Sequence, residues 1–207
     1  MRLVCISDTH GLHGLMNHIP DGDVLIHAGD LTNHGEVDQV ESFNEWLGDL
    51  PHSHKLVIAG NHDFCFESQP SLCKKLLSNC RYLMDSECVI DGINFYGSPW
   101  QPWFYDWAFN LHRGPEIHAK WKQIPLNTDV LITHGPPKGF GDKTAQGDLA
   151  GCEDLLKEIL KRNIRLHVSG HIHEGYGTTT NKDTPFVNAS ICTLNNNPTN
   201  PPIVIDL

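Results

Sequence analysis

Five short apolar runs recur along the chain and share one pattern. Each is three to five residues long, rich in β-branched side chains, and followed within a residue or two by Gly, Asp or His. Runs that are apolar at every position, rather than at alternate positions, are typical of strands buried on both faces of a parallel sheet. The predicted strands cover residues 3–6, 24–26, 55–59, 130–132 and 166–168.

Helical spacing appears between these runs. Apolar residues three and four apart over 37–50 predict an amphipathic helix that Pro51 ends. A second stripe over 155–160 follows the acidic turn 152–154 and precedes Lys161 and Arg162, as the helix dipole favours. Strands that alternate with such helices predict βαβ units and an α/β fold.

The remaining patterns predict further strands. Residues 88–90 and 93–96 flank Asp91-Gly92, a pair typical of a type I′ hairpin turn. Residues 186–190 and 203–205 also resemble strands. Because 207 residues can form one sizeable core and no Gly/Ser/Pro linker divides them, we expect a single domain over 1–207 with two packed sheets and helices outside.

An aromatic segment lies at residues 98–107, where three tryptophans accompany Phe104 and Tyr105. The pattern favours a satellite hydrophobic cluster beneath a loop. The alternative is an aromatic wall that binds a base or another ring.

Polar side chains follow all five predicted strands. Ligands bind at the carboxyl edge of open α/β sheets, so these residues are candidates for one site. Taken singly, a histidine there is more often a solvated loop residue, Asp30 could cap a helix, and Asn61 could be a turn residue. Five segments with the same arrangement, flanked by Gly29, Gly60, Gly135 and Gly170, favour one functional site instead. Its candidate residues are Asp8, His10, Asp30, Asn61, His62, His134, His171 and His173.

The types of donor indicate which ions would bind. Imidazole, carboxylate and amide groups suit Mn, Fe, Zn or Co better than Mg or Ca, which prefer oxygen ligands alone. Apart from His62, the candidates are two carboxylates, four histidines and one asparagine, which are too many for one ion. They suit two ions roughly 3.5–4 Å apart that share a carboxylate. We expect two divalent transition-metal ions, with Mn²⁺ preferred.

Composition narrows the class of partner. The net charge is −10, with 25 Asp and Glu against 15 Lys and Arg, which disfavours extended binding to a nucleic-acid duplex. Seven cysteines without a Cys-x-x-Cys pair fit neither a disulfide framework nor a zinc ribbon. No apolar run approaches 18 residues, so we expect no association with a membrane and a cytoplasmic location.

The motifs Asp8-x-His10, Gly29-Asp30, Gly60-Asn61-His62-Asp63, His134-Gly135 and Gly170-His171-x-His173 resemble, in order and spacing, those of the calcineurin-like metallophosphoesterases. The segments 133–137, 170–177, 187–190 and 201–206 are similar to the metallophosphoesterase-domain-containing branch. The resemblance implies a four-layer α/β/β/α sandwich of two mixed sheets.

The resemblance also implies a role for each donor. Asp8, His10 and His173 would hold one metal, Asn61, His134 and His171 the other, and Asp30 would bridge them. His62 would face the substrate and act on the leaving oxygen. Some members of the branch carry a replacement at the first His of Gly-His-x-His, with weakened catalysis, whereas His171 is present here.

One departure bears on the substrate. Protein phosphatases of this superfamily follow the bridging Asp with a motif that ends in Asp-Arg, where Arg clamps the phosphate. Asn33 and His34 lie in this region here, so the bidentate Arg fork is missing. Asn33 could still orient His62, and we expect Asn61, His62, Asn33 and His34 to contact the substrate.

These observations predict a phosphodiesterase that acts on small phosphodiesters or nucleotides through a metal-bridging hydroxide, with His62 and Asp30 as catalytic residues. One alternative is a nuclease similar to the Mre11-type members, which the acidic charge and the lack of a capping domain disfavour. The other is a slow or inactive nucleotide-binding scaffold protein, which the presence of His62 and His171 disfavours.

Overall fold

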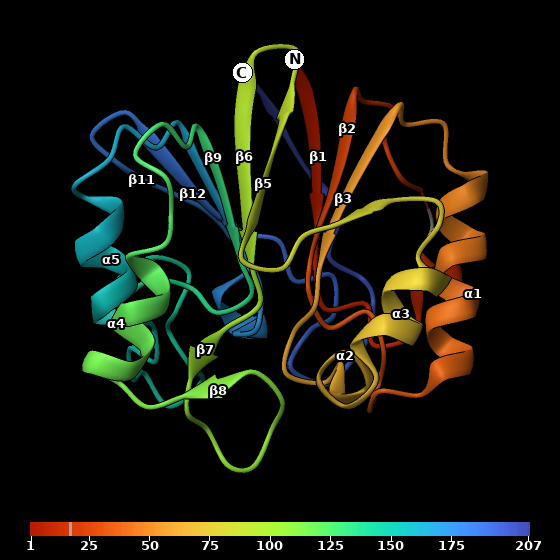
Figure 1. Ribbon diagram of the computed structural model, residues 1–207, viewed down its shortest axis with the longest axis horizontal. Helices are drawn as coiled ribbons and strands as arrows, with labels where there is room; N and C mark the ends of the chain where they lie inside the picture. Colours follow the sequence, from red (N-terminus) through yellow and green to blue (C-terminus); the bar gives the residue numbers. More distant parts are fainter. Residues whose placement is uncertain (17) are drawn as a thin grey trace.

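The computed structural model describes residues 1–16 and 18–207. Two large mixed sheets pack face to face, and helices cover both outer faces (Figure 1). The four-layer α/β/β/α sandwich expected from the sequence is therefore confirmed.

The first sheet has the strand order β13-β1-β2-β3-β4. Strands β1 to β4 are parallel, and β13 pairs antiparallel with β1 at one edge. Their bounds are β1 Arg2–Ile6, β2 Val24–Ala28, β3 His54–Ile58, β4 Arg81–Tyr82 and β13 Ile203–Asp206.

The second sheet has the order β11-β12-β10-β9-β6-β5. Its four central strands are parallel, and its two edge strands are antiparallel to their neighbours. The bounds are β5 Ser86–Ile90, β6 Ile93–Ser98, β9 Val130–Thr133, β10 Leu166–Ser169, β11 Gly177–Asn181 and β12 Thr184–Asn188. A small pair, β7 (Gln101–Pro102) and β8 (Asn110–Leu111), lies below the sheets in Figure 1.

Helices α1 (Val37–Asp49), α2 (Phe64–Ser68) and α3 (Pro70–Leu76) cover the first sheet, and α4 (Pro115–Trp121) and α5 (Glu153–Ile159) cover the second (Figure 1). The two helices expected over 37–50 and 155–160 are confirmed as α1 and α5. Sequence periodicity missed α2, α3 and α4, which have five to seven residues. Helix α5 is as short, but its apolar stripe lies between an acidic first turn and the basic Lys161 and Arg162, which made it recognisable. Two 3-10 turns complete the elements: η1 (His13–Leu15) and η2 (His173–Gly175).

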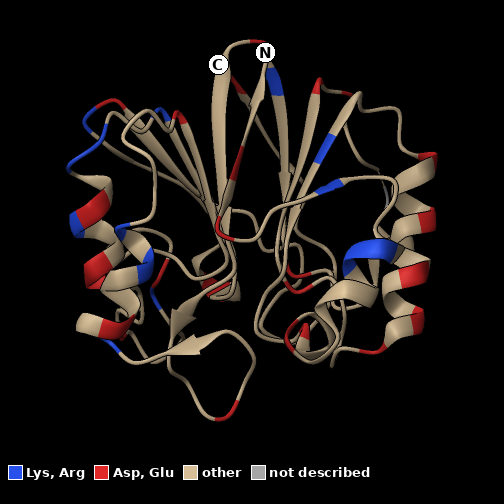
Figure 2. Ribbon diagram, in the orientation of Figure 1, with Lys and Arg blue, Asp and Glu red and all other residues tan. Residues whose placement is uncertain are grey.

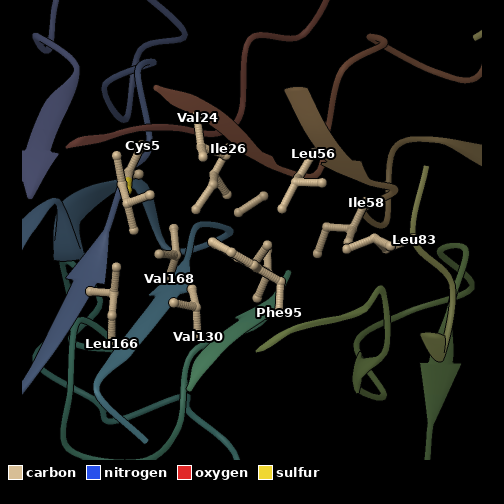
Figure 3. Close-up of a cluster of buried hydrophobic side chains, with 14 of the residues drawn as sticks. Cys5, Val24, Ile26, Leu56, Ile58, Leu83, Phe95, Val130, Leu166 and Val168 are labelled. Carbon is tan, nitrogen blue, oxygen red and sulfur yellow. The ribbon is translucent and has the colours of Figure 1, made fainter. Parts of the chain in front are cut away.

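Alternate residues of each inner strand fill different layers. In β1, Leu3 and Cys5 belong to the cluster between the sheets, whereas Val4 and Ile6 pack in the cluster under α1. Figure 3 shows the inter-sheet cluster, in which side chains from both sheets interdigitate. This burial on both faces explains why the strands are apolar at every position.

The carboxyl ends of the parallel strands meet at one end of the molecule. A parallel bridge between Ser7, after β1, and Ser190, after β12, joins the two sheets there. The seven cysteines are free thiols, and six of them are buried. Within the described residues, no helix is both long and apolar enough to cross a membrane.

Candidate metal centre

The predicted donors converge at the carboxyl ends of both sheets. The first sheet supplies the loops after β1, β2 and β3, and the second supplies the loops after β9 and β10. Three groups of side chains place their donor atoms within 4.8 Å of one another: Asp8 with His10 and His173; Asp8 with Asp30 and His134; and His10 with Asp30 and His62.

Nitrogen and oxygen donors face one another at short range. Nε2 of His10 lies 3.2 Å from Nε2 of His173, and Nε2 of His134 lies 2.9 Å from Oδ1 of Asn61. Oδ2 of Asp30 lies 3.4 Å from Nε2 of His134 and 3.9 Å from Nε2 of His10, so this carboxylate borders both groups. Converging lone pairs of this kind fit a bound cation.

His171 also belongs to the centre, with its ring centroid 5.1 Å from that of His134. The two parts of the donor set therefore fit two divalent ions, and Asp30 lies close to donors of both parts, while its sharing by two ions stays a prediction.

Backbone carbonyl groups fix the orientation of two imidazole rings among the donors. Nδ1 of His134 donates to the oxygen of Ala28 (2.9 Å), and Nδ1 of His173 donates to that of Thr193 (3.0 Å). Each bond sets the tautomer and turns Nε2 toward the centre, as is usual for metal-binding histidines. The contact of Thr193 with His173 could not be predicted from the sequence, because every residue has a backbone carbonyl, whatever its side chain.

His62 is oriented in the same way but by a different segment. Its Nδ1 lies 2.6 Å from the backbone oxygen of Asn33, and its ring packs against Trp107 with centroids 4.2 Å apart. Asn33 thus orients His62 through its main chain rather than through its amide. His34 packs beside Phe64 and Trp107, with ring centroids at 4.8 and 5.6 Å.

Hydrogen bonds hold both carboxylates in place. Asp8 accepts bonds from the backbone N–H of His171 (3.0 Å) and from Oγ of Ser190 (2.8 Å), and Asp30 accepts one from the N–H of His62 (2.8 Å). Ser190 was missed because neither the strand pattern nor the branch motif at 187–190 indicates a partner for its hydroxyl. Its hydroxyl acts across the bridge between the sheets.

Two further buried side chains brace the loops without belonging to the donor set. Asp63 accepts bonds from the N–H groups of Thr32 (2.9 Å) and Gly60 (2.8 Å) and so ties together the loops after β2 and β3. Asn188 donates its amide to the carbonyls of Gly141 and Ile172, both at 2.8 Å, behind the loop that carries His171 and His173. Asp63 lies in a motif recognised from sequence, yet its role depends on a contact with Thr32, 31 residues away.

The charges of the centre favour cations. Burial alone would raise the pKa of Asp8 and of Asp30, but hydrogen bonds and nearby imidazoles hold the pKa of each carboxyl well below its usual range. Burial opposes protonation of His134 and His173 as well, and the adjacent carboxylates overcome it and raise the pKa of each imidazole to about 9. Burial and the neighbouring His134 lower the pKa of His171 to about 4. Ionised carboxylates in a dry centre attract divalent ions.

The donors are held in an uncommon backbone conformation. Asp8, His10, Asp30 and His171 have φ values of 53°, 45°, 57° and 69°, in the left-handed region that side chains other than glycine seldom adopt. Such residues cost roughly 1 kcal/mol or more each and persist only where the surroundings hold them. Glycine is required at Gly60, where a Cβ would lie 2.3 Å from Oδ1 of Asp30.

Two buried histidines support the loops from inside the sheets. Nε2 of His27 lies 3.0 Å from Oγ1 of Thr9, between Asp8 and His10, and Nε2 of His167 lies 2.9 Å from Oγ1 of Thr133, next to His134. Burial lowers the pKa of both imidazoles to about 3. Neither side chain lines the pocket over the centre.

An open pocket of about 210 Å³ lies over the centre. It is lined by Asp30, Asn61, His62, Phe104, Trp107, His171, His173, Glu174 and Leu194. Neither Asn33 nor His34 is among these lining residues, so their contact with substrate stays a prediction. A larger cavity of about 690 Å³, between α5 and the far end of the sheets, contains none of the predicted donors.

Residues 1–175 match the calcineurin-like phosphoesterases, and the chain belongs to this family. The family consists of metal-dependent phosphoesterases, in agreement with the donor set of this chain.

Similar proteins place the chain within the family. It is 49% identical to human metallophosphoesterase domain-containing protein 1, over 100% of this chain and 71% of that protein. It is 28% identical to a probable cyclic nucleotide phosphodiesterase of Synechococcus, over 76% of this chain and 62% of the relative. A crystal structure of a Thermus thermophilus protein has a TM-score of 0.59 at 12% identity, covering 90% of this chain and 88% of that one. The resemblance to the metallophosphoesterase-domain-containing branch is thus confirmed.

Proposed function

We propose that the chain is a phosphodiesterase that hydrolyses small phosphodiesters, nucleotides among them, with two divalent transition-metal ions, manganese preferred. Asp8, His10 and His173 would hold one ion, Asn61, His134 and His171 the other, and Asp30 would contact both. When bound, the ions supply Lewis acidity toward the phosphoryl oxygens and lower the pKa of water.

One observation carries the choice of a diester. Among the described residues that line the pocket there is no Lys or Arg. Apart from the proposed metal donors and His62, the one charged lining residue is Glu174, which is acidic. A phosphoserine monoester brings two negative charges, for which protein phosphatases supply an Arg fork. A phosphodiester brings one negative charge, so a pocket without Lys or Arg disfavours a diester less than it disfavours a phosphoserine monoester.

His62 is suited to protonate the leaving oxygen. Its Nδ1 donates to the carbonyl of Asn33, and Trp107 packs against its ring, so Nε2 is directed to the pocket that His62 lines. A general acid held in this way contributes about 10²–10⁴-fold to the rate. The name of the Synechococcus relative, a probable cyclic nucleotide phosphodiesterase, supports the same substrate class.

The test compares kcat/KM of the manganese-loaded protein for bis-p-nitrophenyl phosphate, for a cyclic nucleotide and for a phosphoserine peptide. We expect the diesters to be the better substrates. His62→Ala should keep the metal content and lower kcat by about 10²–10⁴-fold. His171→Gly, which removes a donor, should lower metal content as well.

Three results would contradict the proposal. A preference for the phosphoserine peptide would make the chain a phosphatase that holds phosphate by another group. Turnover of duplex DNA above that of small diesters would favour the nuclease. Binding of nucleotide without turnover of any ester would favour the scaffold protein.

A further inference from the structure

The loop that joins β7 to β8 carries three exposed aromatic side chains in succession. Trp103, Phe104 and Tyr105 are 50%, 55% and 66% exposed. The loop projects below the sheets in Figure 1, and its residues 103–109 include one acid and no basic side chain (Figure 2). Exposed aromatic rings of this size are uncommon without a function, because each leaves a large apolar area in water.

Only one of the three rings borders the pocket over the donors. Phe104 is among the lining residues, whereas Trp103 and Tyr105 are not. Trp103 stacks on His112 at 6.0 Å with an interplanar angle of 22°. Phe104 has an edge contact with Tyr105, with centroids 4.6 Å apart at 77°, and its side chain stays 55% exposed.

The position of Phe104 relates it to the leaving group. It lies three residues before Trp107, the ring against which His62 packs, and all three side chains line the same pocket. An ester oxygen that His62 protonates therefore lies in the same pocket, of about 210 Å³, that Phe104 lines. Leu194, which is 60% exposed and belongs to a different loop, adds a second apolar side chain to the lining.

Charge limits what this apolar part of the pocket can bind. Glu174 lines the pocket and Asp106 lies in the aromatic loop, so a second phosphate on the leaving group would meet like charge. A flat uncharged ring meets no such penalty and can stack on a phenyl face.

We propose that Phe104 is a specificity-determining residue that binds a planar ring on the alcohol group of the ester, with Leu194 completing an apolar subsite. This inference rests on the proposed function in that it assigns the occupant of the same pocket. The ring can belong to a nucleobase or to a simple aromatic alcohol, which share the stacking chemistry.

The test measures binding rather than turnover. Calorimetry with the manganese-loaded protein compares two pairs of ligands that differ only by a ring: adenosine 5′-monophosphate with ribose 5-phosphate, and phenyl phosphate with methyl phosphate. Phe104→Ala should weaken the ring-bearing member by about tenfold, as stacking on an aromatic side chain predicts, and change the other member by less than about twofold. If Phe104→Ala weakens the ring-bearing ligand of both pairs, the subsite accepts any planar ring. If it weakens adenosine 5′-monophosphate alone, the subsite is selective for a nucleobase.

Trp103→Ala is the matched control, because it removes an equally exposed ring of the same loop that does not line the pocket. It should leave all four affinities within about twofold, and Phe104→Tyr should retain the ring preference. Equal losses with and without the ring, or the same effect from Trp103→Ala, would overturn the inference. If Phe104→Ala removes the ring preference while no diester is hydrolysed, the proposed function alone fails; if diesters are hydrolysed and Phe104→Ala changes no affinity, this inference alone fails.

Discussion

Acid should destabilise this protein through two histidines that are not metal donors. His27 and His167 are fully buried, and burial lowers the pKa of each imidazole to about 3. In the unfolded chain each has an ordinary pKa of about 6.5, so the unfolded state binds more protons between these two values. The contribution of the two neutral imidazoles to the free energy of unfolding is therefore fully present above about pH 6.5, and it is lost as the pH falls toward 3.

The size of the effect follows from these pKa values. At pH 5 the unfolded imidazole has gained its proton and the folded one has not, which costs about 2 kcal/mol for each histidine relative to pH 8. Two such residues remove about 4 kcal/mol, a large part of the roughly 5–15 kcal/mol that stabilises a typical domain. In the metal-free protein His134 and His173, whose pKa is raised to about 9, favour the folded state at pH 5, so the net loss is smaller than this sum.

The assay is denaturant unfolding in EDTA at pH 8 and pH 5, so that metal release does not contribute. His167→Gln offers Thr133 an amide donor in place of the ring N–H and cannot ionise. The difference in unfolding free energy between the two pH values should shrink by about 2 kcal/mol relative to the unsubstituted protein. His54→Gln, at an exposed position of β3, is the control. An unchanged pH difference in His167→Gln would refute the reasoning.

Two further predictions concern the metal centre. Asp30→Asn should lower the metal content of both positions together, because Asp30 borders both donor groups; elemental analysis showing one ion still at full occupancy would contradict a shared carboxylate. Ser190→Ala removes a hydrogen bond to Asp8 and should weaken metal binding by about 10–100-fold, as is typical of residues that orient metal ligands. A chelator competition titration measures this, and an unchanged affinity would mean that His171 N–H alone holds the carboxylate.

Much of the fold could be predicted because its strands are buried on both faces. Continuous apolar runs identified β1, β2, β3, β9 and β10, and Asp91-Gly92 located the hairpin of β5 and β6. Strand β11 could not be predicted, since its Gly177–Asn181 segment is polar and takes its conformation from pairing with β12. Short helices depend on packing in the same way.

The convergence of the candidate donors could be predicted because each follows the end of a strand, and the carboxyl ends of parallel strands share one edge of a sheet. The groups that orient these donors could not be predicted from the sequence. Thr193 acts through a carbonyl, and Ser190 reaches Asp8 across 182 residues. Trp100 packs against the hydrophobic core, as the first interpretation of the aromatic segment expects. The second, a wall that binds a ring, stays a prediction for Phe104, which is exposed at the pocket.

The left-handed conformation of Asp8, His10, Asp30 and His171 has a consequence for directed evolution. At such positions glycine relieves the backbone and also removes a buried polar group, so the substitution that abolishes a donor is also one that the fold accepts readily. A library screened only for heat tolerance should therefore accumulate glycine there and drift toward catalytically silent variants. Engineering a sturdier form of this protein consequently requires a screen in which every surviving clone must still capture its ions.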